Sequence, residues 1–282
     1  MRLIAYSLKD ENRVRRGVMV DAQNFLEIDG DFRALGPLDL AAIYKTLESA
    51  TTAQNLVKLS EVQLHAPIPN PSKILCIGLN YRDHCQESGQ PIPDHPVLFA
   101  KFNNTLVGSE GNIQLNGSSR QVDYEAELAF VIGKKAYRVA ESVAMEYVAG
   151  YITANDVSGR DLQFSDNQWV RGKSQDTFCP MGPWLVTADE VPNPHNLRIS
   201  CRVNGTTLQD SNTNQLIFNV PTLLSFLSQG ITLEPGDVVL TGTPPGVGFA
   251  RKPPIFLKAG DVVEVEIEKV GLLKSHVMEQ IG

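Results

Sequence analysis

The chain has 282 residues, of which 42% are hydrophobic and 20% are charged, and its formal net charge is −7. A chain of this length and composition buries its own core without disulfides or a structural metal, which excludes a disordered or fibrous protein. No segment is strongly basic and no run of about 18 apolar residues occurs, which argues against a nucleic-acid partner and against a membrane span.

The start of the chain has strand and helix signals of its own. Two short apolar runs flank a charged turn and predict a β-hairpin, Leu3–Tyr6 and Gly17–Val20. Apolar residues at helical spacing predict helices over Leu38–Leu47 and Ala53–Leu59. Together these elements predict a small α/β region.

A proline-rich break follows this region. Residues 66–72 hold three prolines, and proline restrains its predecessor and cannot donate to a β-ladder. We therefore interpret the break as a linker between a small N-terminal region, residues 1–70, and a catalytic domain, residues 71–282.

The chain after the linker is rich in strands. Asn204-Gly205 is typical of a type I′ hairpin turn, and helices are expected over residues 140–148 and 221–229. The pattern predicts a β-dominated α+β fold, because it lacks the regular strand–helix alternation of a doubly wound sheet. The predicted strands are Ile74–Ile77, Val97–Phe102, Ala126–Ile132, Gly150–Ala154, Leu197–Val203, Val238–Thr241 and Val262–Ile267.

The cysteines carry no metal or disulfide signature. Cys76, Cys85, Cys179 and Cys201 form no CxxC pair, and their spacing suits neither a zinc site nor a compact disulfide framework. Reduced thiols are the default in a cytosolic protein, and the apolar run at the N-terminus is too short for a secretory signal. These observations predict a cytoplasmic protein.

One predicted strand carries acidic residues. Because side chains alternate along a strand, Glu125 and Glu127 share one face with Ala129 and Val131. Two carboxylates on a face that otherwise looks buried repel each other unless a cation pairs them, and hard divalent cations prefer such oxygens. An exposed polar strand edge is the alternative that this pattern leaves open.

A third carboxylate follows the next predicted strand. Asp156 comes shortly after Gly150–Ala154, where it could be another oxygen ligand or could cap a turn, which is the commoner role of Asp there. Three carboxylates with water would suit Mg²⁺ or Mn²⁺ and not a His-rich zinc site. Residues 71–170 hold eight Lys and Arg against twelve Asp and Glu, and this site would explain much of that acidity.

His84 and Glu87 are candidates for proton transfer. They are three residues apart and would be neighbours on a short helix. A Glu that orients a His is the usual way to build a general base or a water activator, although an incidental surface pair is the alternative. Gly78 and Gly89 flank the segment and would let it move as a lid.

Two later segments suit an anionic substrate. Lys173 is a single lysine in a loop-like segment, and near a metal it could polarise a carbonyl or hold an enolate, although a surface lysine is the alternative. The segment Leu240–Gly248 is a strand followed by a rigid Gly/Pro turn, which can present backbone N–H groups and the Thr243 hydroxyl to a carboxylate. It lacks the Gly-Lys-Ser/Thr step of a P-loop.

In this order the motifs resemble the fumarylacetoacetate hydrolase superfamily. The resemblance covers about residues 71–282 and rests on GLNYRDHCQE, VLFAKF, DYEAELAFVIG, ITANDVSGRDLQ, RGKSQDTFCPMGP and LTGTPPGVG. The stretches NTNQLIF and GFARKPPIFLKAGD resemble most the subgroup related to the animal FAH-domain-containing proteins and to bacterial diketo-acid hydrolases. The resemblance implies a mixed β-roll or β-sandwich, a homodimer, and Mg²⁺ or Mn²⁺ as cofactor.

The resemblance also implies roles for individual residues. The implied metal ligands are Glu125, Glu127 and Asp156, the implied catalytic residues are His84, Glu87 and Lys173, and the implied substrate contacts are Arg160, Gln163 and Thr243. The fumarylacetoacetate hydrolases proper have an additional carboxylate ligand from elsewhere in the chain. We treat Asp123 as a non-ligand.

The implied activity is divalent-metal-dependent hydrolysis of a C–C bond in 2,4-dioxo acids such as acylpyruvates. The metal and Lys173 would stabilise the enolate, and His84, oriented by Glu87, would activate the water. The alternative is an oxaloacetate keto–enol tautomerase or decarboxylase that uses the same site. A non-enzymatic binding module is a weaker hypothesis, since all the expected site residues are present.

Overall fold

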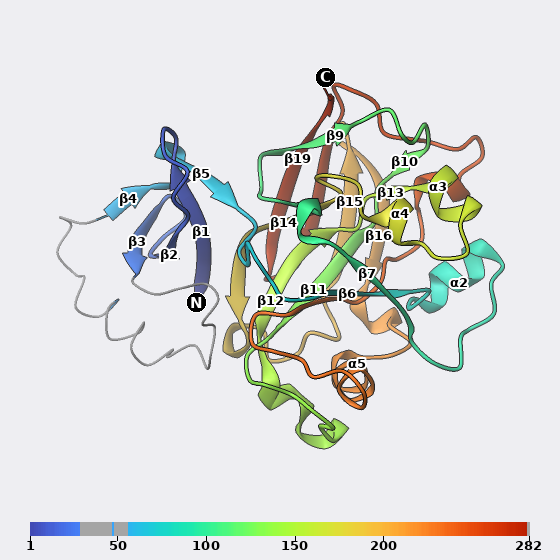
Figure 1. Cartoon of the computed structure of the whole chain (residues 1–282), viewed down its shortest axis with the longest axis horizontal. Helices are drawn as coiled ribbons and strands as arrows, with labels where there is room; N and C mark the ends of the chain where they lie inside the picture. Colours follow the sequence, from blue (N-terminus) through green and yellow to red (C-terminus); the bar gives the residue numbers. More distant parts are fainter. Residues whose placement is uncertain (29–46, 48–55, 281–282) are drawn as a thin grey trace.

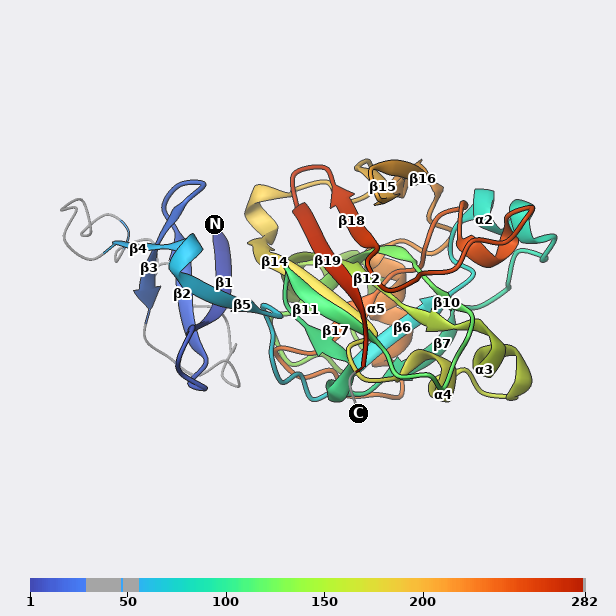
Figure 2. The same ribbon diagram turned by 90° about the horizontal axis from the view of Figure 1, so that it is seen from above.

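The computed structural model describes residues 1–28, 47 and 56–280 (Figure 1). Strands β1 to β5 lie to one side of the rest of the molecule, and both views show this separation (Figure 2). The bounds of this first group are β1 Arg2–Leu8, β2 Arg15–Met19, β3 Asn24–Ile28, β4 Leu56–Lys58, the 3-10 helix η2 Leu59–Glu61, and β5 Val62–His65.

The predicted N-terminal hairpin is confirmed, because β1 and β2 pair antiparallel with Leu3 opposite Val18. The helix predicted over Ala53–Leu59 is wrong where the chain is described. Residues 56–58 instead pair with β3, since a short apolar run fits a strand as well as a helix. The helix predicted over Leu38–Leu47 lies outside the described residues except for its last position.

A 12-stranded sheet runs through the molecule. Its main path has the order β4-β3-β2-β1-β14-β12-β11-β17-β6-β7, and the pairing of β1 with β14 joins the N-terminal strands to the remainder. The division of the chain at residues 66–72 remains a prediction. The later strands of this sheet are β6 Ile74–Gly78, β7 Val97–Lys101, β8 Leu106–Val107, β11 Ala126–Ile132, β12 Val148–Asn155, β14 Cys179–Thr187 and β17 Val238–Leu240.

A five-stranded sheet has the order β16-β15-β18-β19-β9, and β10 pairs with β13 in a short ladder. The predicted turn at Asn204-Gly205 is confirmed, because both residues have positive φ angles, 51° and 76°, between β15 and β16. The bounds are β9 Gly111–Leu115, β10 Val122–Asp123, β13 Ser158–Gly159, β15 Arg198–Val203, β16 Thr206–Asn212, β18 Val262–Ile267 and β19 Gly271–Glu279.

The helices are short. Helix α5 begins as expected, because the Asn219 side chain accepts a hydrogen bond from the Thr222 amide and Pro221 occupies the first turn. The helix predicted over residues 140–148 is a 3-10 helix that leads directly into β12. The bounds are α2 Arg82–Ser88, α3 Arg160–Ser165, α4 Val170–Lys173, α5 Val220–Ser228, η3 Asn103–Thr105, η4 Glu141–Tyr147, η5 Ala188–Glu190, η6 Thr213–Gln215 and η7 Gly248–Ala250.

Strand β11 lies at the centre of the core and is buried on both faces. Leu128 and Phe130 belong to the core cluster that includes the apolar face of α5, whereas Ala129 and Val131 belong to a second cluster. The alternation predicted for this strand is therefore confirmed, and so is a β-dominated α+β fold. Within the described residues, no helix has the length and apolarity needed to span a bilayer.

Candidate active site

Three buried carboxylates meet at the ends of two neighbouring strands. Glu125 directly precedes β11, Glu127 is its second residue, and Asp156 directly follows β12. The two strands run antiparallel with Glu127 opposite Ala154, so these positions come together at one edge of the pair. One oxygen from each carboxylate lies within 4.8 Å of the others, and all three residues are buried.

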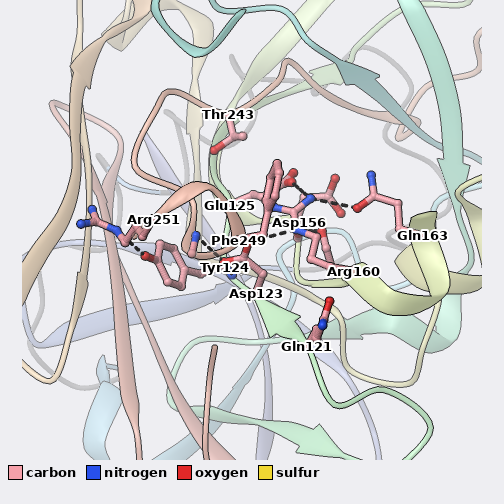
Figure 3. A network of polar contacts seen from close by, with 12 residues as sticks. Gln121, Asp123, Tyr124, Glu125, Asp156, Arg160, Gln163, Thr243, Phe249 and Arg251 are labelled. Atoms are coloured by element: carbon pink, nitrogen blue, oxygen red, sulfur yellow. Dashed lines mark hydrogen bonds and ion pairs between the residues drawn. The ribbon is translucent and has the colours of Figure 1, made fainter. Parts of the chain in front are cut away.

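Cationic side chains surround this group. Lys173 Nζ lies 2.8 Å from Glu125 Oε2 and 2.8 Å from Asp156 Oδ2. Lys101 Nζ lies 2.6 Å from the other oxygen of Asp156, and Arg160 Nη1 lies 2.6 Å from Glu125 Oε1. The side chains of Glu125, Asp156 and Arg160 converge at the centre of Figure 3.

The surrounding charges act differently on two of the carboxylates. Burial alone would raise the pKa of Glu125, but Lys173 and Arg160 outweigh it and lower this pKa to about 2. Burial and the nearby charges of Asp156 and Glu125 raise the pKa of Glu127 well above its usual value. Glu127 Oε2 accepts a hydrogen bond from the Gly242 amide at 2.7 Å.

This donor set fits a divalent cation. Together with Asp123, the buried cluster holds four carboxylates against the three cations Lys101, Arg160 and Lys173, which leaves an excess of one negative charge. Closely spaced carboxylate oxygens are the ligands that Mg²⁺ and Mn²⁺ prefer, and a cation would relieve the repulsion that Glu127 experiences. The predicted ligand set therefore comes together in space, as the sequence pattern requires.

Lys173 is positioned by a helix and not by the loop expected from the sequence. The Lys173 amide donates to the Trp169 carbonyl at 3.0 Å, which closes the turn of α4. Gly172 allows α4 to approach α3 closely, because a Cβ at this position would lie 2.6 Å from the Gln163 amide nitrogen. Lys173 is buried, and burial alone would lower the pKa of its amine. The charges of Asp156 and Glu125 outweigh this effect and raise the pKa above its usual value.

Asp123 lies beside the carboxylate group but serves as a structural acceptor. Its side chain is fully buried and accepts hydrogen bonds from the amides of Tyr124, Gly248 and Phe249 and from Arg160 Nε. These four bonds occupy the acceptor positions that a cation would need. The geometry therefore agrees with our treatment of Asp123 as a non-ligand.

The three predicted substrate contacts lie around this cluster. Arg160 Nη1 donates to Gln163 Oε1 at 2.9 Å, one turn further along α3. The Thr243 hydroxyl accepts a hydrogen bond from Gln209 Nε2 at 2.9 Å, which leaves its proton available for donation. All three predicted contacts are buried, and Figure 3 shows Arg160 and Gln163 on one helix with Thr243 on a separate segment of the chain.

The predicted His84–Glu87 pair forms on helix α2. His84 Nδ1 lies 3.1 Å from Glu87 Oε2, and the other Glu87 oxygen accepts a hydrogen bond from the Gly246 amide at 2.8 Å. Burial alone would raise the pKa of Glu87, but the bonds from His84 and Gly246 outweigh it and lower this pKa. His84 also contributes to lowering the pKa of Glu125.

Two residues of the site were missed in the sequence. Lys101 is the last residue of β7, and its charged side chain is fully buried against Asp156. Gln209 accepts a hydrogen bond from the Ala126 amide and donates to Thr243, so it links β11 to the segment that carries this hydroxyl. The available signal for Lys101 was a charged residue that ends an apolar strand, in the motif VLFAKF.

Comparison with known proteins decides the family. The model described as fumarylacetoacetate (FAA) hydrolase C-terminal matches residues 73–278. The chain belongs to the fumarylacetoacetate hydrolase family. It is therefore an enzyme, and the predicted fold of this family is confirmed. Members are typically divalent-metal-dependent, which agrees with the three clustered carboxylates.

Similar proteins of this family carry out different reactions. The Xenopus laevis protein named "Oxaloacetate tautomerase fahd2, mitochondrial" is 46% identical over 291 residues, which cover 99% of this chain and 90% of the relative. The structure of 5-carboxymethyl-2-hydroxymuconate delta-isomerase from Mycobacterium smegmatis has a TM-score of 0.81 at 35% identity, and that of maleylpyruvate hydrolase from Sphingobium sp. SYK-6 has 0.83 at 30%. Both comparisons cover 99% of this chain and 100% of the other.

The predicted cytoplasmic location is contradicted by these relatives. The Xenopus protein is named as mitochondrial, although it matches almost the whole of this chain. The prediction depended partly on reduced cysteines, and the four cysteines are indeed free and buried. Free thiols do not distinguish one reducing compartment from another, so they could not support that location.

Proposed function

We propose that this enzyme is a divalent-metal-dependent oxaloacetate keto–enol tautomerase. The observation that carries the proposal is the near full-length similarity to a protein named as an oxaloacetate tautomerase. The geometry supports it, because a protonated Lys173 lies between two carboxylates of a buried acidic cluster, where it can stabilise an enolate.

Each residue of the cluster has a part in this proposal. Glu125, Glu127 and Asp156 would hold Mg²⁺ or Mn²⁺, which supplies Lewis acidity for a 2-oxo acid. Thr243 and Gln163 would bind the substrate carboxylate. Lys173 Nζ would give a proton to C3 of the enol, and the proton released from the enol oxygen would return to the same amine. The net change is one proton moved from oxygen to carbon.

C–C hydrolysis, the first prediction from the sequence, is the second candidate. The observation that favours it is the His84–Glu87 hydrogen bond, because Glu87 occupies Nδ1 and leaves Nε2 to take a proton from water. An acylpyruvate would then be cleaved between C3 and the distal carbonyl. Enolate stabilisation is common to both reactions, whereas water activation is needed only for hydrolysis.

The test compares both substrates on one preparation. Purified enzyme with Mg²⁺ is given oxaloacetate, with loss of the enol followed by ultraviolet absorbance, and separately acetylpyruvate, with product formation followed by chromatography. We expect fast conversion of oxaloacetate and slow or no cleavage of acetylpyruvate. Efficient cleavage of acetylpyruvate without tautomerisation would overturn the proposal, as would full activity after exhaustive chelation with EDTA.

We expect the enzyme to act as a homodimer on small 2-oxo acids, as the family resemblance implies. Light scattering would test the dimer, and the activity with Mn²⁺ in place of Mg²⁺ would test the choice of cation.

A further inference from the structure

The Arg160 guanidinium has an unused donor edge. Its Nε donates to Asp123 Oδ2 at 2.9 Å, and its Nη1 is bonded to Gln163 Oε1 and to Glu125 Oε1. Among the described residues, Nη2 has no hydrogen-bond partner, although the arginine is only 2% exposed. A buried donor pair without an acceptor is unfavourable, so this edge is arranged for an acceptor supplied by a ligand.

An aromatic ring covers the face of the same guanidinium. Arg160 Cζ lies 4.4 Å from the centroid of the Phe249 ring, as in a cation–π contact. The edge of a second ring, Phe164, supports the first, with centroids 5.4 Å apart and planes at 65°. Figure 3 shows Phe249 beside Arg160 and Glu125, close to the metal-ligand group.

The position of this ring is fixed by the carboxylate that also fixes the arginine. Asp123 accepts hydrogen bonds from the amides of Gly248 at 2.7 Å and Phe249 at 3.0 Å, in addition to Arg160 Nε. A Cβ at Gly248 would lie 2.6 Å from Asp123 Oδ1 and would collide with the Ile255 carbonyl, so only glycine allows this approach. The ring and the guanidinium therefore keep a fixed relative position.

We propose that Phe249 is a specificity-determining residue that selects 2-oxo acids with a second carboxylate. The ring covers one face of the guanidinium and excludes water from it, which leaves the in-plane hydrogens of Arg160 Nη2 as the binding edge. A carboxylate meets such an edge in the plane and gains charge-assisted hydrogen bonds, which are strengthened by the low local dielectric. The inference rests on the proposed function for the claim that the substrate is a 2-oxo acid.

A neutral substrate tail would leave the same edge unpaired. 2-Oxobutanoate has the length of oxaloacetate but a methyl group in place of the distal carboxylate, so it would bury Nη2 without an acceptor.

The test measures selectivity between these two acids. Wild type, Phe249→Ala and Phe249→Tyr are compared in kcat/KM for oxaloacetate and for C3 proton exchange of 2-oxobutanoate, both with Mg²⁺. The matched control is Tyr137→Ala, which removes an exposed ring 5.3 Å from the Arg138 guanidinium, beyond the end of β11, whereas the carboxylates lie at the start of that strand. Thermal unfolding of each variant shows whether it folds.

We expect Phe249→Ala to lower the preference for oxaloacetate about tenfold, mainly through KM, because water that reaches the guanidinium weakens its charge-assisted hydrogen bonds to the second carboxylate. The Phe249→Tyr variant and the Tyr137→Ala control should keep the preference. An unchanged preference in folded Phe249→Ala would overturn the inference, as would equal losses with both acids.

A binding measurement separates this inference from the proposed function. Calorimetry of Mg²⁺-loaded protein with each acid requires no turnover. If wild type fails to tautomerise oxaloacetate, the proposed function fails, yet tighter binding of oxaloacetate than of 2-oxobutanoate that is lost in Phe249→Ala still supports the inference. Equal affinity of wild type for the two acids would overturn it.

Discussion

The carboxylate cluster and helix α2 are built in different ways. Glu125, Glu127 and Asp156 lie at the ends of two neighbouring antiparallel strands, are buried, and each has a backbone or cationic partner nearby. His84 and Glu87 lie on a two-turn helix near the surface, and the Glu87 side chain is 25% exposed. With the proposed roles, the groups that stabilise the enolate belong to the buried core, whereas the groups that activate water lie on a peripheral helix, and this division would let one family support several reactions.

Removal of the charged Lys173 side chain should have the largest effect on activity. We expect Lys173→Met to lower tautomerisation of oxaloacetate about a thousandfold, because the variant loses the only proton-bearing group assigned to the enolate and leaves Glu125 and Asp156 without their shared partner. The measurement is kcat/KM with Mg²⁺. Lys135→Met, which removes an exposed ion pair with Glu234, is the control. A loss below about tenfold would show that the core cluster does not carry the chemistry as described.

The next prediction separates the two regions directly. We expect His84→Ala to lower any acylpyruvate hydrolysis about a hundredfold and to lower tautomerisation less than about fivefold, because only hydrolysis needs an activated water. Both rates are measured on the same preparation. The control His276→Ala removes a surface histidine that pairs with Glu110 at 2.9 Å. Equal losses in the two reactions would contradict the division of roles between cluster and helix.

The smallest effect concerns the attachment of α2. The pKa of Glu87 is lowered in the folded state, so its stabilisation is present above the ordinary glutamate pKa and is lost as the pH falls through the lower folded value. We expect Glu87→Gln to unfold about 2 °C below wild type at pH 7, with the gap closing below about pH 4. Scanning calorimetry measures the unfolding temperatures at pH 7 and in acid, with the exposed Glu146→Gln as control. A gap that widens in acid would contradict the assigned hydrogen bonds.

Local sequence patterns were enough to predict much of the cluster. The period of two around Glu125 and Glu127 predicted one face for both, and β11 has the bounds expected from its apolar run. The place of Asp156 after a strand left a turn role open, and the family resemblance made it a predicted ligand, whereas the spacing of three between His84 and Glu87 predicted their contact. In each case the spacing within one short element sets the geometry.

Long-range contacts account for what the sequence could not reveal. Lys101 is 55 residues from Asp156, and Gln209 is 83 residues from Ala126, so their roles depend on strand register across the sheets. The strand at residues 56–58 exists because β3 provides a partner. The cover of Arg160 by Phe249 likewise depends on Asp123, which binds both segments at once.

The most direct test of the account is the location of the cation. A crystal soaked with Mn²⁺ and oxalate would reveal the ion by its anomalous scattering. We expect one peak in contact with oxygens of Glu125, Glu127 and Asp156, with Lys173 beside the oxalate and Asp123 still bonded to Arg160. A peak elsewhere, or one that includes Asp123 in place of Glu127, would contradict the assignment of the site.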